Sequence, residues 1–353
     1  MGDTVMPKHA TRPVAEKSRI AFDAIHVGML SRFNELVIEI GGDPVALLAH
    51  VGLAPSEVSR ATYRQFVPLL EIAASELECP DFGMRLAVRQ SAGALTGPLG
   101  DGIRNSGTFG EALKFVCKHS YAHSLAAWIW LKRSLHGERV VVGHDILLDG
   151  LPKKSQATEY LLLVGLLAMY ELTNDRIRAQ RVVFRHDPLS LPKVYRQYFG
   201  CEVGFGRSAD AIIYRQQDLS CVIGVPNPMA CKAAADAIKA RFPCRKPPMY
   251  ADVRGIISHV LGTEVCTRDH VAGLLHLHPR TMVRRLAAEG TSFQQIRDEV
   301  RRERLLDLTQ QSDLDFMAIS EKLGFSEQAV MTRYCHKWFA MSPTHLRAGA
   351  APN

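Results

Sequence analysis

Two stretches near the C-terminal end of the chain repeat one pattern: residues 271–293 read VAGLLHLHPRTMVRRLAAEGTSF, and residues 319–342 read ISEKLGFSEQAVMTRYCHKWFAMS. Each begins with a helical pattern that contains a small residue, Ala272 or Ser320, which lie 48 positions apart. A second helical pattern with an apolar i, i+4 pair follows, and by its end the offset between the copies has grown to 50. A small side chain lets two helices approach closely, as a helix-turn-helix requires. We therefore predict two helix-turn-helix units in tandem.

The turn and the start of the second helix can be placed in each unit. His276 and Gly324 occupy the turn, where glycine or another residue tolerant of the left-handed conformation is favoured. His278 and Ser326 take the N-cap position of the second helix. Pro279 follows His278 at the first helical position, where a backbone N–H is not needed. Both units therefore carry turn and helix-start signals in addition to apolar periodicity.

The second helix of each unit divides into an apolar face and an exposed face. In the first unit Met282 and Leu286 face the core, which leaves Arg280 and Arg284 as an i, i+4 pair on another face. In the second unit the apolar stripe comprises Met331, Cys335, Trp338 and Phe339, and the opposite face carries Ala329, Arg333 and His336. An exposed arginine near the start of such a helix can donate two hydrogen bonds to guanine or bind a phosphate. These faces therefore predict contacts with DNA.

The segment between the two units reads as one continuous helix, at about residues 292–310. At 1.5 Å per residue it spans roughly 28 Å. Successive major grooves on one side of a DNA duplex lie ~34 Å apart. One chain could therefore place its two units in adjacent major grooves.

The residues before this region mix helical and strand patterns, which predicts an α+β domain. Helical periodicity runs from 20 to 81 with breaks at 41–44 and 53–55, where Gly and Pro cluster. Two strands joined at His136-Gly137 form a hairpin signal, and the first is apolar on both faces, which predicts cover on both sides. A Gly-rich loop is expected at 93–107. The other expected elements are helices at 81–88, 108–120, 156–173 and 192–199, and strands at 125–133, 139–146, 181–186 and 211–215.

A change of structural class divides the chain. Pro226-Asn227-Pro228 closes the α+β domain, a helix follows at about 229–241, and 242–248 form a linker with Pro, Lys and Arg. After Tyr250 every pattern is helical. The expected organisation is a disordered tail (1–18), an α+β effector or dimerisation domain (19–225), a helix and linker (226–249), and an all-α domain of two tandem helix-turn-helix units (250–348). Signals between the domains are expected to pass through 226–250.

The composition is that of an ordinary globular protein, with 47% hydrophobic and 22% charged residues in 353. The net charge of +7 hints at a nucleic-acid partner, but residues 250–353 carry 13 Lys and Arg against 12 Asp and Glu. The placement of arginines, and not bulk charge, therefore carries the DNA prediction. The sequence shows no signal peptide and no apolar run of about 20 residues. Eight cysteines without a CxxC pair suit reduced thiols, so we expect a cytoplasmic protein with no membrane partner.

The repeat resembles the DNA-binding domain of AraC/XylS-family transcription regulators. The likeness covers about 98 residues and rests on 277–293, on Leu323-Gly-Phe-Ser326 and on Met341-Ser-Pro343. Residues 25–225 resemble the effector domain of the branch typified by the ornithine-responsive and mycobacterial virulence regulators. That likeness is carried by Phe82-Gly-Met-Arg-Leu86, Gly97-Pro-Leu-Gly100 and Tyr198-Phe-Gly-Cys-Glu-Val203. The resemblance implies a regulatory rather than a catalytic N-terminal domain.

The resemblance also implies which residues touch DNA. In the first unit the base-reading positions are Arg280, Val283 and Arg284, with Thr281 beside them. In the second unit they are Gln328, Ala329, Val330 and Arg333, and His336 falls where a phosphate-contacting Lys or Arg is usual.

Three core or turn residues of the second unit depart from the family pattern. Cys335 replaces a common Phe, Ala340 a common Gly, and Met331 an often aromatic residue. A smaller core residue at 335 is expected to loosen this unit by about 1–3 kcal/mol unless Trp338 or Phe339 refills the space. We therefore expect the first unit to make the better-defined DNA contacts.

Several residues admit a structural as well as a functional interpretation. The arginines at 280, 284 and 333 could belong to a solvated helix face, but their agreement with the repeat favours DNA contact. Trp128 and Trp130 could line an apolar effector pocket or pack in the core. Residues Cys117, His119 and His123 could supply metal ligands on successive helical turns, but no fourth ligand is evident in the sequence. We expect no metal and no cofactor.

These observations predict a bacterial transcription regulator. The expected partners are double-stranded promoter DNA, a small-molecule effector, RNA polymerase and a second copy of the chain, and the expected mode is activation. In the alternative hypothesis the N-terminal domain is a ligand-free dimerisation or protein-interaction module. An enzyme with a helical accessory domain would need a catalytic constellation, and the sequence has no nucleophile elbow, phosphate-binding Gly loop or carboxylate pair.

Overall fold

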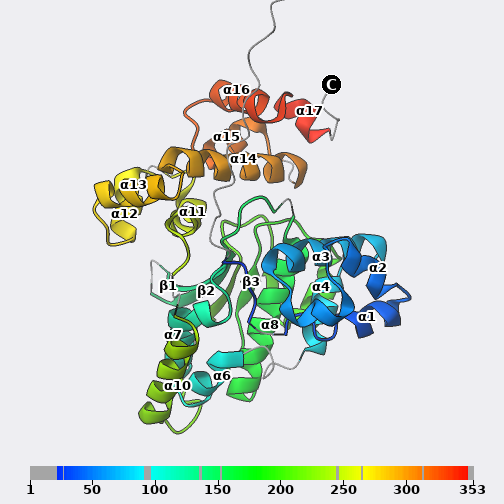
Figure 1. Cartoon of the computed structure of the whole chain (residues 1–353), viewed down its shortest axis with the longest axis vertical. Coiled ribbons are helices and arrows are strands. Elements are labelled where there is room, and N and C mark those ends of the chain that lie inside the picture. Colours follow the sequence, from blue (N-terminus) through cyan, green and yellow to red (C-terminus); the bar gives the residue numbers. More distant parts are fainter. Residues whose placement is uncertain are drawn as a thin grey trace, which may run out of the picture.

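The computed structural model describes residues 22–348 apart from 27, 91–96, 135–136, 152, 244–245, 264 and 312–313. The chain folds into two lobes (Figure 1). We call residues 22–242 the N-terminal lobe and residues 249–348 the C-terminal lobe. The tail predicted at 1–18 and His136 of the predicted hairpin lie outside the described residues. Among the described residues, no helix combines the length and the apolar character needed to cross a bilayer.

The first part of the N-terminal lobe is helical, with breaks where Gly and Pro predict them. Gly41 ends the first helix at φ +94°, and Asp43 Oδ1 accepts a hydrogen bond from the Val45 N–H at 2.8 Å to start the next. Helix was predicted from residue 20, but residues 22–26 are not helical, and Ala24 forms a β-bridge with Thr62. The elements are α1 (Phe33–Ile40), α2 (Pro44–Ala49), η1 (Pro55–Arg60), α3 (Tyr63–Glu76) and α4 (Phe82–Arg89).

The stretch predicted to be a Gly-rich loop (93–107) contains helical turns, and its residues 93–96 lie outside the described part of the chain. Residues 97–104 form these turns, and Thr108 then caps the next helix by accepting from the Glu111 N–H at 3.2 Å. The elements are η2 (Gly97–Leu99), α6 (Gly100–Arg104), α7 (Phe109–His119) and η3 (Ser120–Ala122).

Helix α8 (Ser155–Thr173) is the central element of the N-terminal lobe. Most of its side chains are buried, as expected for a helix that is apolar all round, and it packs against α3, α4 and the sheet. Gly83 of α4 permits the close approach, since a Cβ there would lie 2.3 Å from the Gln156 carbonyl oxygen. The Gly83 N–H also donates to Gln156 Oε1 at 2.7 Å. The long helix predicted at 156–173 is thereby confirmed.

A five-stranded sheet with the order β1-β2-β5-β3-β4 completes this lobe. The predicted hairpin is confirmed, because β1 (Ala127–Arg133) and β2 (Arg139–Ile146) pair antiparallel. β1 lies at an edge, and Ile129 and Leu131 are only half-buried, so the predicted cover on both faces is incomplete. The elements after α8 are β3 (Arg181–Val183), α9 (Pro192–Phe199), β4 (Glu202–Gly204), β5 (Ala211–Arg215), η4 (Gln216–Ser220) and α10 (Pro228–Arg241).

Two features of the sheet differ from the prediction. β3 ends at Val183 and not at His186, because the Arg185 N–H donates to the Asp210 side chain at 2.8 Å and leaves the strand ladder. β4 was not predicted, since its three residues are too few to show alternation, and it pairs parallel with β3.

The C-terminal lobe is helical throughout its described residues, which confirms the fold class of an α+β lobe followed by two helix-turn-helix units. Its elements are α11 (Met249–Val260), α12 (Arg268–Leu274), α13 (Pro279–Ala288), α14 (Phe293–Gln311), α15 (Phe316–Lys322), α16 (Gln328–Phe339) and α17 (Pro343–Arg347). Helix α10, which precedes them, packs against α6 of the N-terminal lobe.

The two helix-turn-helix units have different cores. The first unit shares one continuous apolar core with the N-terminal lobe, whereas the second has a core of its own around Leu305, Ile319 and Met331. Helix α11 makes the link, since a Cβ at its Gly255 would lie 2.8 Å from Leu147 Cδ2. The lobes therefore also touch directly, outside the 226–250 segment through which signals are predicted to pass.

Candidate nucleic-acid interface

The first unit consists of α12, a turn and α13. Ala272 is fully buried where the two helices meet, and the turn at His276 adopts φ +53°, as predicted from its tolerance of the left-handed region. His278 is the N-cap, and its Nδ1 accepts from the Arg280 N–H at 3.2 Å. Met282 and Leu286 are fully buried and fix the rotation of α13 about its axis. That rotation decides which side chains point outward.

The outward face of α13 carries the side chains predicted to read DNA. Arg280, Val283 and Arg284 are exposed, and Thr281 is half-buried. Among the described residues, neither the Arg280 nor the Arg284 guanidinium forms an ion pair or hydrogen bond. Both guanidinium groups are therefore available to an external acceptor such as a base edge or a phosphate.

The second unit consists of α15, a turn at Gly324 with φ +65°, and α16. Ser320 is buried between the helices, as predicted. The N-cap of α16 is Glu327 and not Ser326, so the helix begins one residue later than predicted. Gln328, Ala329, Arg333 and His336 are exposed, whereas Val330 is half-buried and packs against the core of this unit. Val330 is thus the least available of the predicted base-reading residues.

The core of the second unit accommodates its small residue at 335. Cys335 is fully buried, and Trp338 and Phe339 pack against the same cluster. Trp338 also contacts Tyr334, with ring centroids 4.9 Å apart. This packing is as expected if the aromatic pair fills space that a larger residue at 335 would take.

Ala340 ends α16 in a left-handed conformation, with φ +56°. Because this conformation crowds a Cβ, we expect Ala340→Gly to raise the free energy of unfolding by about 0.5–1 kcal/mol. Urea denaturation of the full chain measures it. Ala348→Gly is the matched control, since Ala348 ends α17 at φ −71° and has no such crowding. Equal effects of the two substitutions would contradict the explanation.

Helix α14 fixes the second unit relative to the first through an arginine that the sequence did not single out. Arg301 Nε donates to the Leu323 carbonyl at 2.9 Å, Nη2 donates to the Gly324 carbonyl, and the guanidinium lies 4.4 Å from the Phe325 ring centroid. Arg301 therefore clamps the turn of the second unit onto α14. Its partners lie 22 or more residues away, so no local pattern could have identified it.

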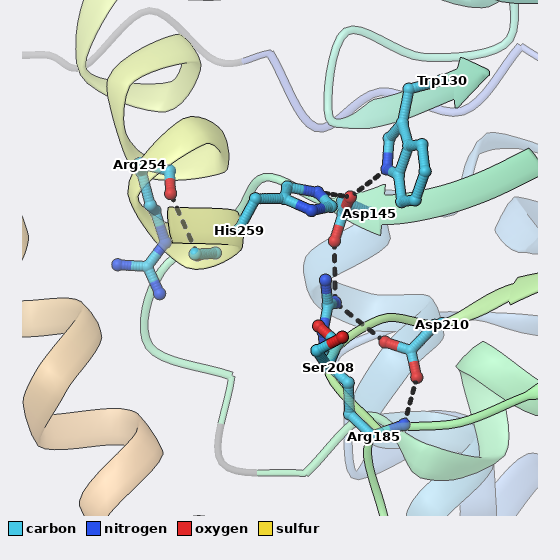
Figure 2. Close-up of polar contacts among 8 residues, drawn as sticks. Trp130, Asp145, Arg185, Ser208, Asp210, Arg254 and His259 are labelled. Atoms are coloured by element: carbon cyan, nitrogen blue, oxygen red, sulfur yellow. Dashed lines mark hydrogen bonds and ion pairs between the residues drawn. The ribbon is translucent and has the colours of Figure 1, made fainter. Parts of the chain in front are cut away.

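The two lobes meet at a buried polar network (Figure 2). Asp145 at the end of β2 accepts from Trp130 Nε1 at 2.5 Å, from His259 Nε2 of α11 at 2.6 Å and from Arg185 Nη1 at 2.7 Å. Arg185 Nη1 also donates to Asp210 at 2.9 Å. Burial alone would raise the pKa of Asp145, but Arg185 and His259 hold it well below its usual range. Asp145 is therefore an anion that joins the sheet to the C-terminal lobe.

Trp128 and Trp130 lie at this junction. Their rings contact His259 edge-on, with centroids 5.4 and 4.8 Å apart. They pack between the sheet and α11, and they do not line the cavity of about 700 Å³ that lies between the lobes. The assignment of these residues to an effector pocket stays a prediction.

The three residues weighed as metal ligands have other surroundings. His119 Nδ1 contacts the Phe115 carbonyl at 3.0 Å, and His123 Nε2 contacts the Tyr63 hydroxyl at 2.9 Å. Burial lowers the pKa of His123 to about 3 and raises that of Cys117 to about 11. Each of these shifts favours the neutral side chain, as expected for packed residues.

Two helix-turn-helix units beside an α+β lobe define a DNA-binding transcription regulator. Residues 41–223 match the family model described as the arabinose-binding domain of AraC transcription regulator, N-terminal, and residues 271–349 match a helix-turn-helix domain model. The HTH-type transcriptional regulator VirS of Mycobacterium tuberculosis is 30% identical over 320 residues, which are 90% of this chain and 94% of VirS. The chain belongs to the AraC family of transcription regulators.

Two further likenesses extend over most of the chain. The ornithine utilization regulator of Pseudomonas aeruginosa is 23% identical over 92% of this chain and 96% of its own length. The crystal structure of the transcriptional regulator CdpR from the same species aligns over 90% of this chain and 96% of that one, with 20% identity and a TM-score of 0.43. The matched family and relatives are transcription regulators and not enzymes.

Proposed function

We propose that this regulator is an activator that reads a promoter with α13 and α16 and responds to a small molecule through its N-terminal lobe. The observation that carries the proposal is the pair of exposed helix faces whose arginines have no partner among the described residues. The rise of α14, 19 residues at 1.5 Å each, is close to the spacing of adjacent major grooves. A regulator of promoters acts on the chromosome, so we place it in the bacterial cytoplasm.

The small-molecule response is supported by the relatives. The matching family model is described as an arabinose-binding domain, and one relative is an ornithine utilization regulator. Both descriptions refer to small molecules, which favours an effector-binding lobe over a ligand-free interaction module. RNA polymerase and a second copy of the chain are the proposed protein partners.

Selection of binding sites from a pool of random DNA duplexes tests the proposal. We expect the full chain to enrich two short conserved blocks about 10–11 base pairs apart, one for each helix-turn-helix unit. A homodimer would select two such pairs of blocks, one pair for each copy of the chain. Enrichment of a single block would contradict simultaneous reading by both units, and no enrichment would contradict sequence-specific binding.

Activation can be measured without any effector. Transcription in vitro from a promoter that carries the selected site should rise on addition of the protein, and a fall would make the protein a repressor.

A further inference from the structure

A cleft of about 700 Å³ lies between the two lobes. One wall comes from the start of α8 and the loops after β3 and β4, and the other comes from α11, α14 and the end of α15. The volume is in the range of small-molecule binding sites. A smaller cavity of about 40 Å³ shares Lys154, Arg185 and Arg304 with it. Any molecule in this cleft would touch both lobes at once.

The cleft carries an excess of positive charge. Six lysine and arginine residues line it, against four aspartate and glutamate residues. Glu303 forms an ion pair with Arg254, and Asp210 forms one with Arg185. Lys154 and Arg304 form no ion pair or hydrogen bond through their side chains within the described part of the chain. Carboxylates such as Asp307 act on both cations only through space, so among the described residues the two cations face the cleft without a direct ion pair.

The surroundings of these cations oppose their charge. Burial lowers the pKa of Lys154, and Arg185 and Arg304 lower it further, whereas Glu303 and Asp307 oppose part of the shift. Burial and Arg185 likewise lower the pKa of Arg304, against a smaller opposing effect of the aspartates Asp210, Asp307 and Asp145. Arg185, with a side chain only 10% exposed, has one buried nitrogen, Nη2, without a hydrogen-bond partner. Because an unpaired buried charge is unfavourable, an anion placed among these groups would be strongly held.

The rest of the cleft favours an organic anion over an inorganic one. Leu261, Leu308, Leu314 and Leu323 supply an apolar wall from the C-terminal lobe. Asp307 also lies in the cleft, where burial raises its pKa and the cations Lys154 and Arg304 lower it. An apolar wall beside unpaired cations suits a molecule with a hydrocarbon body and a carboxylate.

We propose that the cleft is the effector site and binds a small organic acid, whose carboxylate pairs with Lys154 and Arg304 and whose apolar body lies against the leucine wall. The inference rests on the proposed response to a small molecule. Because Lys154 belongs to the N-terminal lobe and Arg304 to the C-terminal lobe, the acid bridges the lobes. It thereby favours the arrangement in which the lobes are close, and the DNA-reading helices are coupled to effector binding.

Isothermal titration calorimetry on the full chain tests the site. The probes are octanoate, decanoate and 3-phenylpropionate, each with its matching alcohol as a neutral control. At least one acid should bind, and its alcohol should bind at least tenfold more weakly. Lys154→Met and Arg304→Met should each weaken binding of that acid at least tenfold. Arg302→Met is the matched control on the same helix, since Arg302 is exposed outside the cleft and should leave the affinity unchanged.

Acid binding in the cleft and DNA reading by the two helix-turn-helix units can fail independently of each other. The site is overturned if none of the acids binds at millimolar concentrations, if an alcohol binds as tightly as its acid, or if both cleft variants keep wild-type affinity. Selection of DNA sites without any ligand tests DNA reading independently. If an acid binds in the cleft but leaves affinity for the selected DNA site unchanged, the cleft is a binding site but not the effector site, and the proposal is overturned, while DNA reading by the two units is unaffected. Circular dichroism of the variants checks that each is folded.

Discussion

Arg185→Met is expected to lower the free energy of unfolding by about 3–5 kcal/mol, because it leaves two buried carboxylates without their shared cation. Asp145 and Asp210 are each at most 7% exposed, and both contact Arg185 Nη1. Methionine preserves much of the length of the side chain, so the loss reports charge and hydrogen bonding more than packing. Urea unfolding of the full chain measures the difference.

The matched control is Arg181→Met in β3, four residues before Arg185. Arg181 pairs with Glu202 at 2.8 Å, but the pair is at the surface, with side chains 33% and 67% exposed. Surface pairs of this kind contribute about 0–1 kcal/mol, so the control should lose little stability. A loss in Arg185→Met no larger than that in the control would contradict a structural role for the buried network.

The pH dependence of the Arg185→Met defect follows from the same network. In the wild type, Arg185 and His259 hold the pKa of Asp145 down, so the folded state is stabilised by the ionised form. Without the guanidinium, burial raises the pKa of Asp145, and the folded variant binds protons more readily than its unfolded chain. The deficit should therefore shrink as the pH falls from 7 toward 5. A deficit that grows over this range would show that another group dominates.

Arg284→Ala and Arg333→Ala are each expected to weaken binding to the selected operator by about 1–3 kcal/mol, or roughly 5- to 150-fold. Both side chains lie on exposed helix faces that the buried residues of α13 and α16 turn outward. We expect the larger effect at Arg284, since α13 places a second arginine, Arg280, on the same face. Fluorescence anisotropy with a labelled operator, at one fixed salt concentration, measures the affinities.

A base contact differs from a phosphate contact in its sequence dependence. Loss of a base contact should relax specificity at one operator position, whereas loss of a phosphate contact weakens all sequences alike. Lys232→Ala, which removes one exposed charge from α10, controls for the change in net charge. If both arginine variants bind like this control, α13 and α16 are not the reading helices.

Local chemistry made the C-terminal lobe predictable from sequence. A turn that needs the left-handed region selects His276 and Gly324, and the spacing of Met282 and Leu286 fixes which face of α13 is buried. These signals involve residues within one or two helical turns of each other. The same locality explains the correct prediction of the hairpin and of α8.

Longer-range features escaped prediction because their partners are distant in the chain. Arg185 and Asp145 are separated by 40 residues, and His259 and Asp145 by 114. Strand β4 is too short for a pattern and exists because β3 pairs with it. Nothing near Lys154 or Arg304 in the sequence indicates that the fold brings the two side chains to one cleft.

The sequence by itself therefore determined that this chain carries two helix-turn-helix units and which of their faces point outward, because helix periodicity and turn chemistry are local. Only the tertiary structure decided how the lobes meet. The first unit shares its core with the N-terminal lobe, and Asp145 ties the sheet to α11. Such contacts depend on which charged and apolar surfaces become buried together when the whole chain folds, and no single segment encodes that burial.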